Sequence, residues 1–197
     1  MSSLLQNKKI ILASHNPGKI KEFQDLLEPL GIVLTPLDSP EHEAPEETGA
    51  TFRENALIKA KHAAEHQNCL VLADDSGLEI EVLDNQPGVY TGRRYYEAGG
   101  LQQIAEKLEK DLRPFTNKRA RFVCVLCLYY PDDTFEFFEG HVEGQMVFPP
   151  RGNNSFGYDP IFQPLGHQRT FAQMPAAEKH ALSHRAKAVD QLIRAHQ

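Results

Sequence analysis

Lys19, in the first turn of a predicted helix, is the first residue whose position suggests chemistry. A predicted buried strand at 9–13 leads into "SHNPGKIKEF", where Asn16 suits the helix N-cap and Pro17 the first helical position. Lys19 is then near the positive end of the helix dipole, where a cation costs roughly 0.3–1 kcal/mol, so its removal should not lower stability. The free backbone N–H groups at the helix N-terminus, the helix dipole and the lysine together suit an anion such as phosphate, although the G-x-x-x-x-G-K spacing of a Walker loop is absent. A solvated lysine on an ordinary turn is the alternative.

Two pairs of carboxylates stand at the ends of predicted elements. Glu46 and Glu47 close an acidic loop at 38–49, and Asp74 and Asp75 follow a buried apolar run. Hydrolysis of a phosphoanhydride needs a divalent cation and a positioned water, and strand ends are where α/β proteins usually bind ligands. Neighbouring side chains on an extended segment point to opposite faces, so only one of the two aspartates should face a given pocket. Alternatively "ADDSG" is only a turn, and an aspartyl-phosphate nucleophile lacks its D-x-D pattern.

The loop "SFGYDPIF" combines aromatic and acidic side chains. Phe156 or Tyr158 can stack on a nucleobase, and Asp159 can accept a hydrogen bond from a ring N–H. The competing interpretation is a loop whose aromatic rings pack into the core.

Basic residues gather at the start of a final helix predicted at about 176–195. In "EKHALSHRAKA", Lys179 and Ser183 are one helical turn apart, and His184 and Arg185 follow directly. This pattern suits an anionic ligand, but a helix with solvated basic residues gives a similar one. Paired His/Cys spacing typical of zinc sites is missing.

The elements that must position these residues follow from hydrophobic periodicity. A capping box of Thr51 and Glu54 starts the second helix. A tight turn is expected at 75–77, between a buried strand and an alternating one, and strands at 120–130 and 135–147 form an antiparallel hairpin. Strands are also expected at 9–13 and 32–36, and helices at 17–31, 51–66, 99–110 and 176–195. This mixture predicts an α/β fold on a mixed sheet, and the absence of a linker predicts one domain over 1–197.

The composition narrows the function classes. The 197 residues carry a formal net charge of −6 and have a sequence pI near 5.8, which argues against a general nucleic-acid or membrane-surface binder. A positive site must then be local, which favours a small anionic ligand. The three cysteines lie in apolar runs, so the C-x-x-C at Cys124 and Cys127 is interpreted as core. No signal peptide or membrane-length apolar stretch is found, which predicts a cytoplasmic protein.

Five segments together resemble the inosine triphosphate pyrophosphatase family, whose members act on non-standard purine nucleoside triphosphates. They occur in the family's order and near its spacing: "ASHNPGKIKEF", "PEETGATFRENALIKAKHAA", "ADDSGLEIEVLDNQPGVY", "SFGYDPIF" and "EKHALSHRAKA". Each motif alone is weak, but the ordered set is specific and covers nearly the whole chain. One segment departs from the family: many members have Tyr-Ser-Ala-Arg-Tyr where this chain has "YTGRRYYEAGG" at 90–100, so no role is transferred there.

The resemblance implies roles for residues that match the family's motifs. Its triphosphate-binding turn corresponds to Ser14, Asn16 and Lys19, and its second phosphate-binding lysine to Lys59. Its metal-binding carboxylates correspond to Glu47 and Asp75, with Asp75 also the proton acceptor and Ser76 a substrate contact. Its base-binding loop corresponds to Phe156, Gly157, Tyr158 and Asp159, and its closing basic set to Lys179, His184 and Arg185.

The resemblance also implies an activity and an architecture. The expected enzyme uses Mg²⁺ to hydrolyse ITP, dITP or XTP to the monophosphate and pyrophosphate, which keeps deaminated purines out of nucleic acids. It is expected to be a homodimer with an elongated mixed β-sheet and flanking helices that form two lobes around a substrate cleft. Two alternatives remain: a module that senses nucleotides without hydrolysing them, and a pyrophosphatase of modified pyrimidine nucleotides. The retained carboxylates count against the first and the base loop against the second.

Overall fold

A computed structural model describes residues 4–38, 43–65, 68–153 and 156–197. Sequence predictions for 39–42 of the acidic loop, for His66 at the end of the second helix and for Ser155 in the aromatic loop lie outside these ranges. The chain forms two compact units. Unit 1 comprises 1–75, 124–140 and 184–197, and unit 2 comprises 76–123 and 141–183.

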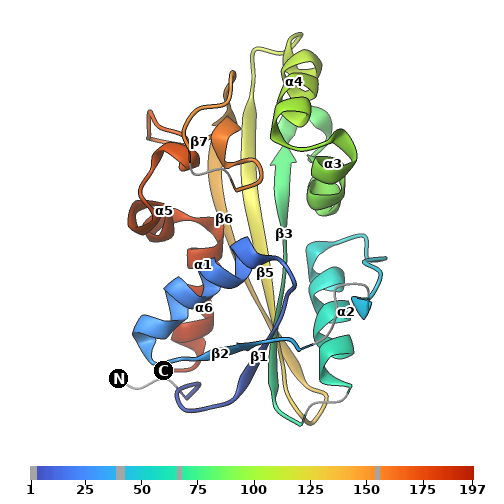
Figure 1. Ribbon diagram of the computed structural model, residues 1–197, viewed down its shortest axis with the longest axis vertical. Helices are drawn as coiled ribbons and strands as arrows, with labels where there is room; N and C mark the ends of the chain where they lie inside the picture. The colour runs from blue at the N-terminus through green and yellow to red at the C-terminus, as the bar shows by residue number, and fades with distance from the viewer. Residues whose placement is uncertain (1–3, 39–42, 66–67, 154–155) are drawn as a thin grey trace. The chain divides into compact units, whose positions relative to one another are not determined.

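The described residues form a mixed α/β fold, as predicted, with one sheet of seven strands (Figure 1). The sheet order is β2-β1-β3-β5-β6-β7, with β4 paired to β3; β1 is parallel to both β2 and β3. The strands are β1 (Ile10–Ala13), β2 (Leu34–Pro36), β3 (Leu70–Ile80), β4 (Gln86–Pro87), β5 (Arg119–Tyr129), β6 (Phe135–Met146) and β7 (Phe162–Pro164). The helices are α1 (Pro17–Leu27), α2 (Phe52–Ala64), α3 (Thr91–Ala98), α4 (Leu101–Leu112), α5 (Ala176–Leu182) and α6 (His184–Ala195). The single domain and the arrangement of lobes around a cleft stay predictions.

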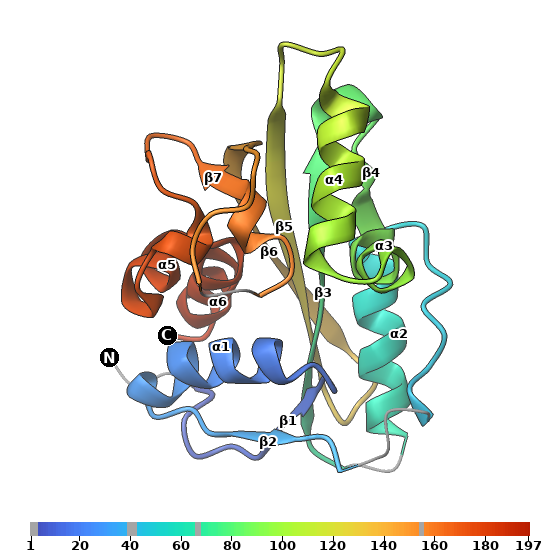
Figure 2. The same cartoon turned by 45° about the horizontal axis from the view of Figure 1, so that its top comes forward.

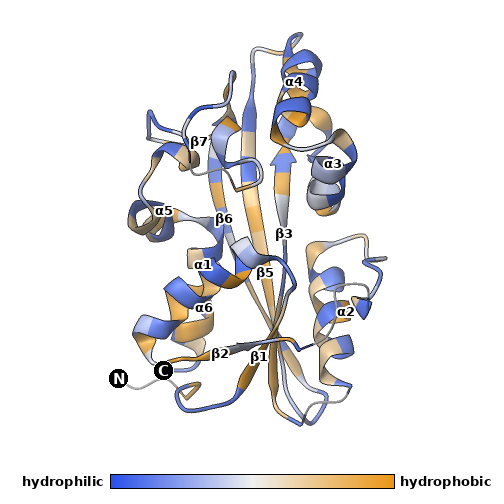
Figure 3. Ribbon diagram, in the orientation of Figure 1, coloured by the Kyte–Doolittle hydropathy of each residue, from blue (hydrophilic) through white to orange (hydrophobic). Residues whose placement is uncertain are grey.

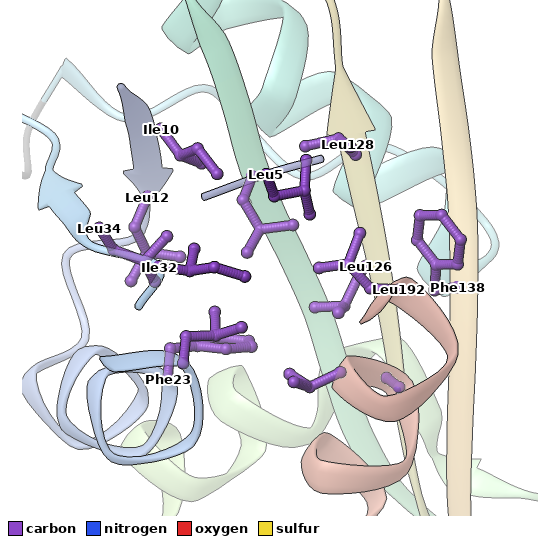
Figure 4. Packing of buried hydrophobic residues seen from close by; sticks show 14 of the residues in the cluster. Leu5, Ile10, Leu12, Phe23, Ile32, Leu34, Leu126, Leu128, Phe138 and Leu192 are labelled. Atoms are coloured by element: carbon purple, nitrogen blue, oxygen red, sulfur yellow. The ribbon is translucent and has the colours of Figure 1, made fainter. Parts of the chain in front are cut away.

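In unit 1, helices cover both faces of the parallel strands. Figures 1 and 2 show α1 and α6 on one side of β1 and α2 on the other. Ile10 and Leu12, alternate residues of β1, pack with Phe23 of α1 and Leu192 of α6 in one buried cluster (Figure 4). On the opposite side α2 contributes small buried side chains, Ala56 and Ala60 among them. Strands covered on both faces are hydrophobic almost throughout, as β1 and the unit 1 part of β5, residues 124–129, are; Figure 3 shows β1 and the lower part of β5 mainly in orange.

Unit 2 has a separate core. Its buried cluster joins alternate residues of β3, Leu78 and Ile80, to the apolar face of α4. Three aromatic rings complete it: Phe122 and Phe162 have ring centroids 4.5 Å apart, and Phe162 and Phe171 5.4 Å. The base-loop residues predicted from the sequence therefore lie on a firmly packed unit.

The two cysteines of the C-x-x-C belong to the core, as predicted. Cys124 and Cys127 are buried free thiols in β5, and burial raises the pKa of each to about 12. Thiols with raised pKa values form little thiolate near neutral pH, so neither suits a redox or metal-binding role.

Three predictions of secondary structure were wrong. The turn expected at 75–77 is absent, because β3 runs without a break from Leu70 to Ile80 and the side chain of Asp75 has partners on α2. The final helix is divided into α5 and α6 by Ser183, whose backbone is extended. Helix α3 was missed, because no helix or strand was predicted for its residues. The hairpin of β5 and β6 and the capping box of Thr51 and Glu54 are confirmed.

Candidate active site

The start of α1 has the predicted cap. The side chain of Asn16 accepts a hydrogen bond from the Lys19 backbone N–H at 3.1 Å, and Ser14 Oγ accepts one from the Asn16 N–H at 3.3 Å. The Lys19 ammonium lies 2.8 Å from Asp74 Oδ2 on β3, and its side chain is only 18% exposed. The solvated-lysine alternative is therefore wrong. Lys19 is held by a buried carboxylate that offsets the unfavourable helix dipole.

Asp74 is the centre of a buried group of charges on the face of β3 that α1 and α6 cover, here named the Asp74 cluster. Arg185 of α6 forms an ion pair with Glu22 of α1, and its Nη2 lies 3.8 Å from Asp74 Oδ2. Burial by itself would raise the pKa of Asp74, but the charges of Lys19 and Arg185 hold that pKa well below its usual value. The cluster, Lys19, Glu22, Asp74 and Arg185, is thus a balanced set of two cations and two anions.

Gly140 of β6 allows α6 to bring Arg185 to this cluster. A Cβ atom at Gly140 would lie 2.2 Å from the backbone oxygen of His184 and 2.4 Å from the nitrogen of Ala188. Both contacts are far too short, so only glycine permits this close approach of strand and helix.

Asp75 points to the opposite face of β3, toward α2, as the alternation of a strand predicts. Lys59 Nζ lies 2.6 Å from Glu47 Oε1 and 3.0 Å from Asp75 Oδ1, and Asn55 Nδ2 donates to Asp75 Oδ2 at 3.2 Å. We name Glu47, Asn55, Lys59 and Asp75 the Asp75 cluster. Burial raises the pKa of Asp75, although Lys59 and Lys19 act in the opposite direction. Burial would lower the pKa of Lys59, but Asp75, Asp74 and Glu47 raise it overall.

Glu47 and Asp75 have the chemistry that a magnesium site requires. Mg²⁺ prefers oxygen ligands and is usually bound by one or two carboxylates together with substrate phosphates and water. Among the residues that the structure describes, no group of three or more His, Cys, Asp or Glu could hold a metal ion. The two carboxylates, Glu47 and Asp75, fit a cation that completes its coordination with substrate phosphates and water. The Lys59 ammonium lies between them, so a shared cation requires this lysine to move aside.

The aromatic loop of unit 2 separates the two rings that the sequence proposed for stacking. Tyr158 is 3% exposed, packs edge-on against Tyr95 and donates its hydroxyl to the Thr91 carbonyl at 3.0 Å. Phe156 is only half-buried, and the Lys179 ammonium lies 5.3 Å from its ring centroid. Lys179 also pairs with Asp159 at 2.5 Å. Phe156 is therefore the better candidate for stacking, beside an adjacent donor and acceptor.

The structure divides the predicted site residues between the units. Unit 1 holds Ser14, Asn16, Lys19, Glu47, Lys59, Asp75, His184 and Arg185. Unit 2 holds Ser76, Phe156, Gly157, Tyr158, Asp159 and Lys179. No role was predicted for Glu22, three positions after Lys19, or for Asn55, four before Lys59, although helical spacing places each pair on one face.

The two charged clusters lie at the ends of parallel strands, a position typical of ligand sites in α/β proteins. Asp74 directly follows Ala73, the last residue of β3 that pairs with β1, so both charged clusters stand where α/β proteins usually bind ligands. No helix in the described ranges is both long and apolar enough to cross a bilayer. The fold is thus that of a mixed α/β protein, and the two charged clusters are its candidate ligand site.

Comparison with known proteins then gives the family. The model of the Ham1 family matches residues 10–195, and the chain belongs to this family. It is 45% identical to a dITP/XTP pyrophosphatase of Brucella melitensis, over 94% of this chain and 91% of that protein. It is 46% identical to one of Rhizobium meliloti, over 93% and 94%. The solved structure of a HAM1 protein from Coxiella burnetii aligns with a TM-score of 0.81 and 40% identity, over 95% of this chain and 98% of that one.

Proposed function

We propose that this protein is a Mg²⁺-dependent pyrophosphatase that hydrolyses dITP, ITP or XTP to the monophosphate and pyrophosphate. The names of its relatives support this substrate class. The observation that carries the proposal is the Asp75 cluster, in which a lysine lies within hydrogen-bond distance of two carboxylates suited to a divalent cation. Such an enzyme would remove deaminated purines from the nucleotide pool. From the family resemblance we also propose a cytoplasmic homodimer.

In the proposed reaction, the lysines of unit 1 bind the triphosphate and its carboxylates bind the cation. Lys59 and Lys19, two cations near β3, would neutralise charge on the triphosphate, and the N-terminus of α1 adds its positive dipole. When the Lys59 ammonium binds a phosphate instead, Glu47 and Asp75 lose their contacts with it and become available to a cation. When bound to these carboxylates, Mg²⁺ supplies charge neutralisation and polarises phosphate oxygens.

Asp75 is the group best placed to accept a proton. Water attacks the α-phosphorus, the bond between that phosphorus and the bridging oxygen breaks, and the proton of the attacking water passes to the Asp75 carboxylate. Pyrophosphate leaves with the bridging oxygen.

The choice of bond is the first test. Purified protein with Mg²⁺ should convert dITP to dIMP and pyrophosphate in equal amounts, measured by chromatography with separate assays for pyrophosphate and orthophosphate. EDTA should abolish the reaction, and added Mg²⁺ should restore it. Orthophosphate with dIDP would contradict the assignment. Tight binding of dITP without any product would instead indicate a nucleotide sensor.

Base selectivity tests unit 2. Hypoxanthine offers an acceptor at position 6 and a donor at N1, which match the paired Lys179 ammonium and Asp159 carboxylate. Adenine presents the reverse pattern, and each mispaired buried group costs about 1–3 kcal/mol. Guanine shares both groups with hypoxanthine and differs by an added 2-amino group, so selection against GTP requires a tight or unpaired environment at C2. We expect catalytic efficiency for ITP and dITP to exceed that for GTP by at least about tenfold and that for ATP by more. Similar efficiency for ATP and ITP would rule out this base pocket.

A variant pair tests stacking in the same assay. Phe156→Ala should weaken the binding of all purine triphosphates together, because stacking does not depend on the hydrogen-bonding edge of the base. Phe115→Ala, at an exposed phenylalanine of the same unit, is the matched control and should leave their Michaelis constants unchanged.

A further inference from the structure

Asn55 joins the segment before α2 to β3. Its side chain is 1% exposed, and both ends of its carboxamide have partners. Oδ1 accepts a hydrogen bond from the Gly49 N–H at 2.8 Å, and Nδ2 donates to Asp75 Oδ2 at 3.2 Å. The partners determine the orientation of the amide, because a backbone N–H can only donate and a carboxylate can only accept.

The segment that carries Glu47 is tied tightly to the start of α2. The N–H groups of Ala50 and Thr51 donate to Glu54 Oε2 at 2.7 and 2.9 Å, which forms half of the capping box. At Gly49 a Cβ atom would lie 2.6 Å from Asn55 Oδ1 and 2.6 Å from Glu54 Cβ, so a side chain there would push the segment away. Glu47 is only two residues before Gly49, so the Asn55–Gly49 hydrogen bond restrains where its carboxylate can lie.

Asn55 also determines which oxygen of Asp75 is available. Because Oδ2 accepts from Asn55, Oδ1 is the oxygen that faces Lys59, and Lys59 in turn contacts Glu47. A single buried amide thus orients one predicted cation ligand directly and the other through the backbone of Gly49.

We propose that Asn55 is a positioning residue that holds Glu47 and Asp75 in the arrangement needed to bind one divalent cation. This inference rests on the proposed function, because it assumes that these two carboxylates share the cation. Residues that orient metal ligands by hydrogen bonding typically change metal affinity by 10–100-fold when they are replaced. Alanine at position 55 keeps the helix and removes both hydrogen bonds.

The test measures cation binding directly. Mn²⁺, a paramagnetic substitute for Mg²⁺, is titrated into the protein with a non-hydrolysable α,β-imido analogue of dITP, and free Mn²⁺ is followed by electron paramagnetic resonance. We expect Asn55→Ala and Gly49→Ala each to weaken Mn²⁺ binding by about 10–100-fold. The Mn²⁺ affinity of the double variant should be only slightly lower than that of whichever single variant binds Mn²⁺ more weakly, because both changes break the hydrogen bond between Asn55 and Gly49. Asn117→Ala, at a half-buried asparagine of unit 2 bonded to Glu81, is the control and should bind normally.

A purely structural role gives a different result. Asn55→Ala would then melt at a lower temperature but bind Mn²⁺ like the wild type, which would overturn the proposal. If Asn55→Ala does not fold, Gly49→Ala decides the question from the other end of the hydrogen bond. Glu47→Gln separates the two proposals: loss of Mn²⁺ in this variant but not in Asn55→Ala or Gly49→Ala rejects the positioning role alone. A wild-type complex that binds no Mn²⁺ rejects the cation site as well.

Discussion

Replacing Asp75 by asparagine is expected to reduce turnover of dITP by at least about 100-fold, the size of effect typical of a lost general base. Asparagine keeps the shape of the side chain but cannot accept the proton and removes one charged ligand from the pair with Glu47. Initial rates at saturating dITP and Mg²⁺ measure the effect. Asp111→Asn, at an exposed carboxylate paired with Lys107, is the matched control and should turn over normally. Near-normal turnover of Asp75→Asn would exclude Asp75 as the base.

The same variant should be at least as stable as the wild type near neutral pH. Burial raises the pKa of Asp75 above its ordinary 3.8, so the ionised group makes folding less favourable as pH rises from 3.8 through the folded-state pKa. Asparagine lacks this unfavourable contribution, and Lys59 keeps Glu47 as a partner. Urea unfolding across pH should show the advantage of the variant at neutral pH and its loss below about pH 3.8. If Asp75→Asn loses turnover but not stability, the lost activity is due to the chemical role of Asp75 and not to misfolding.

Replacing the neighbouring Asp74 by asparagine should have the opposite effect and lower the free energy of unfolding by about 3–5 kcal/mol. Asp74 is 1% exposed and is the anion nearest to Lys19, so its removal leaves the buried charges with an unbalanced positive charge. Urea denaturation at pH 7 measures the loss. Asp25→Asn is the control: it breaks only the surface ion pair with Lys21, one helical turn away, and should lower the free energy of unfolding by no more than about 0.5 kcal/mol. Equal stabilities of the Asp74 variant and the wild type would contradict a stabilising Asp74 cluster.

The pH dependence gives a second check on Asp74. Its pKa is lowered in the folded state, so the stability that it contributes is present above the ordinary value of 3.8 and is lost as pH falls through the folded-state pKa. The difference between the variant and the wild type should therefore narrow only in strong acid. Lys19→Ala should also lower stability, contrary to the expectation from the helix dipole alone, because it removes the nearer counter-ion of Asp74.

The sequence by itself determined the local features of this protein. The cap at Asn16 and the capping box at Thr51 depend on residues within three positions of each other, and both form as predicted. The opposite directions of Asp74 and Asp75 follow from the two-residue period of a strand. Hydrophobic periodicity predicted the mixed α/β class, because buried faces repeat at the period of each element. The ordered motifs identified the family before any contact was known.

Only the tertiary structure decided which charges meet. Glu22 and Arg185 are 163 residues apart in the chain, and Asn55 and Asp75 are 20 apart. Their pairing depends on which helix covers which face of β3, and local propensity carries no information about that choice. The expected turn at Asp75 failed for the same reason: Asp, Ser and Gly favour turns in isolation, but hydrogen bonds from α2 and the burial of Leu78 and Ile80 keep this segment extended. Burying a carboxylate costs free energy unless the group has a partner. The pKa values of Asp74 and Asp75 therefore depend on cations that are distant in the sequence, such as Lys19 and Lys59.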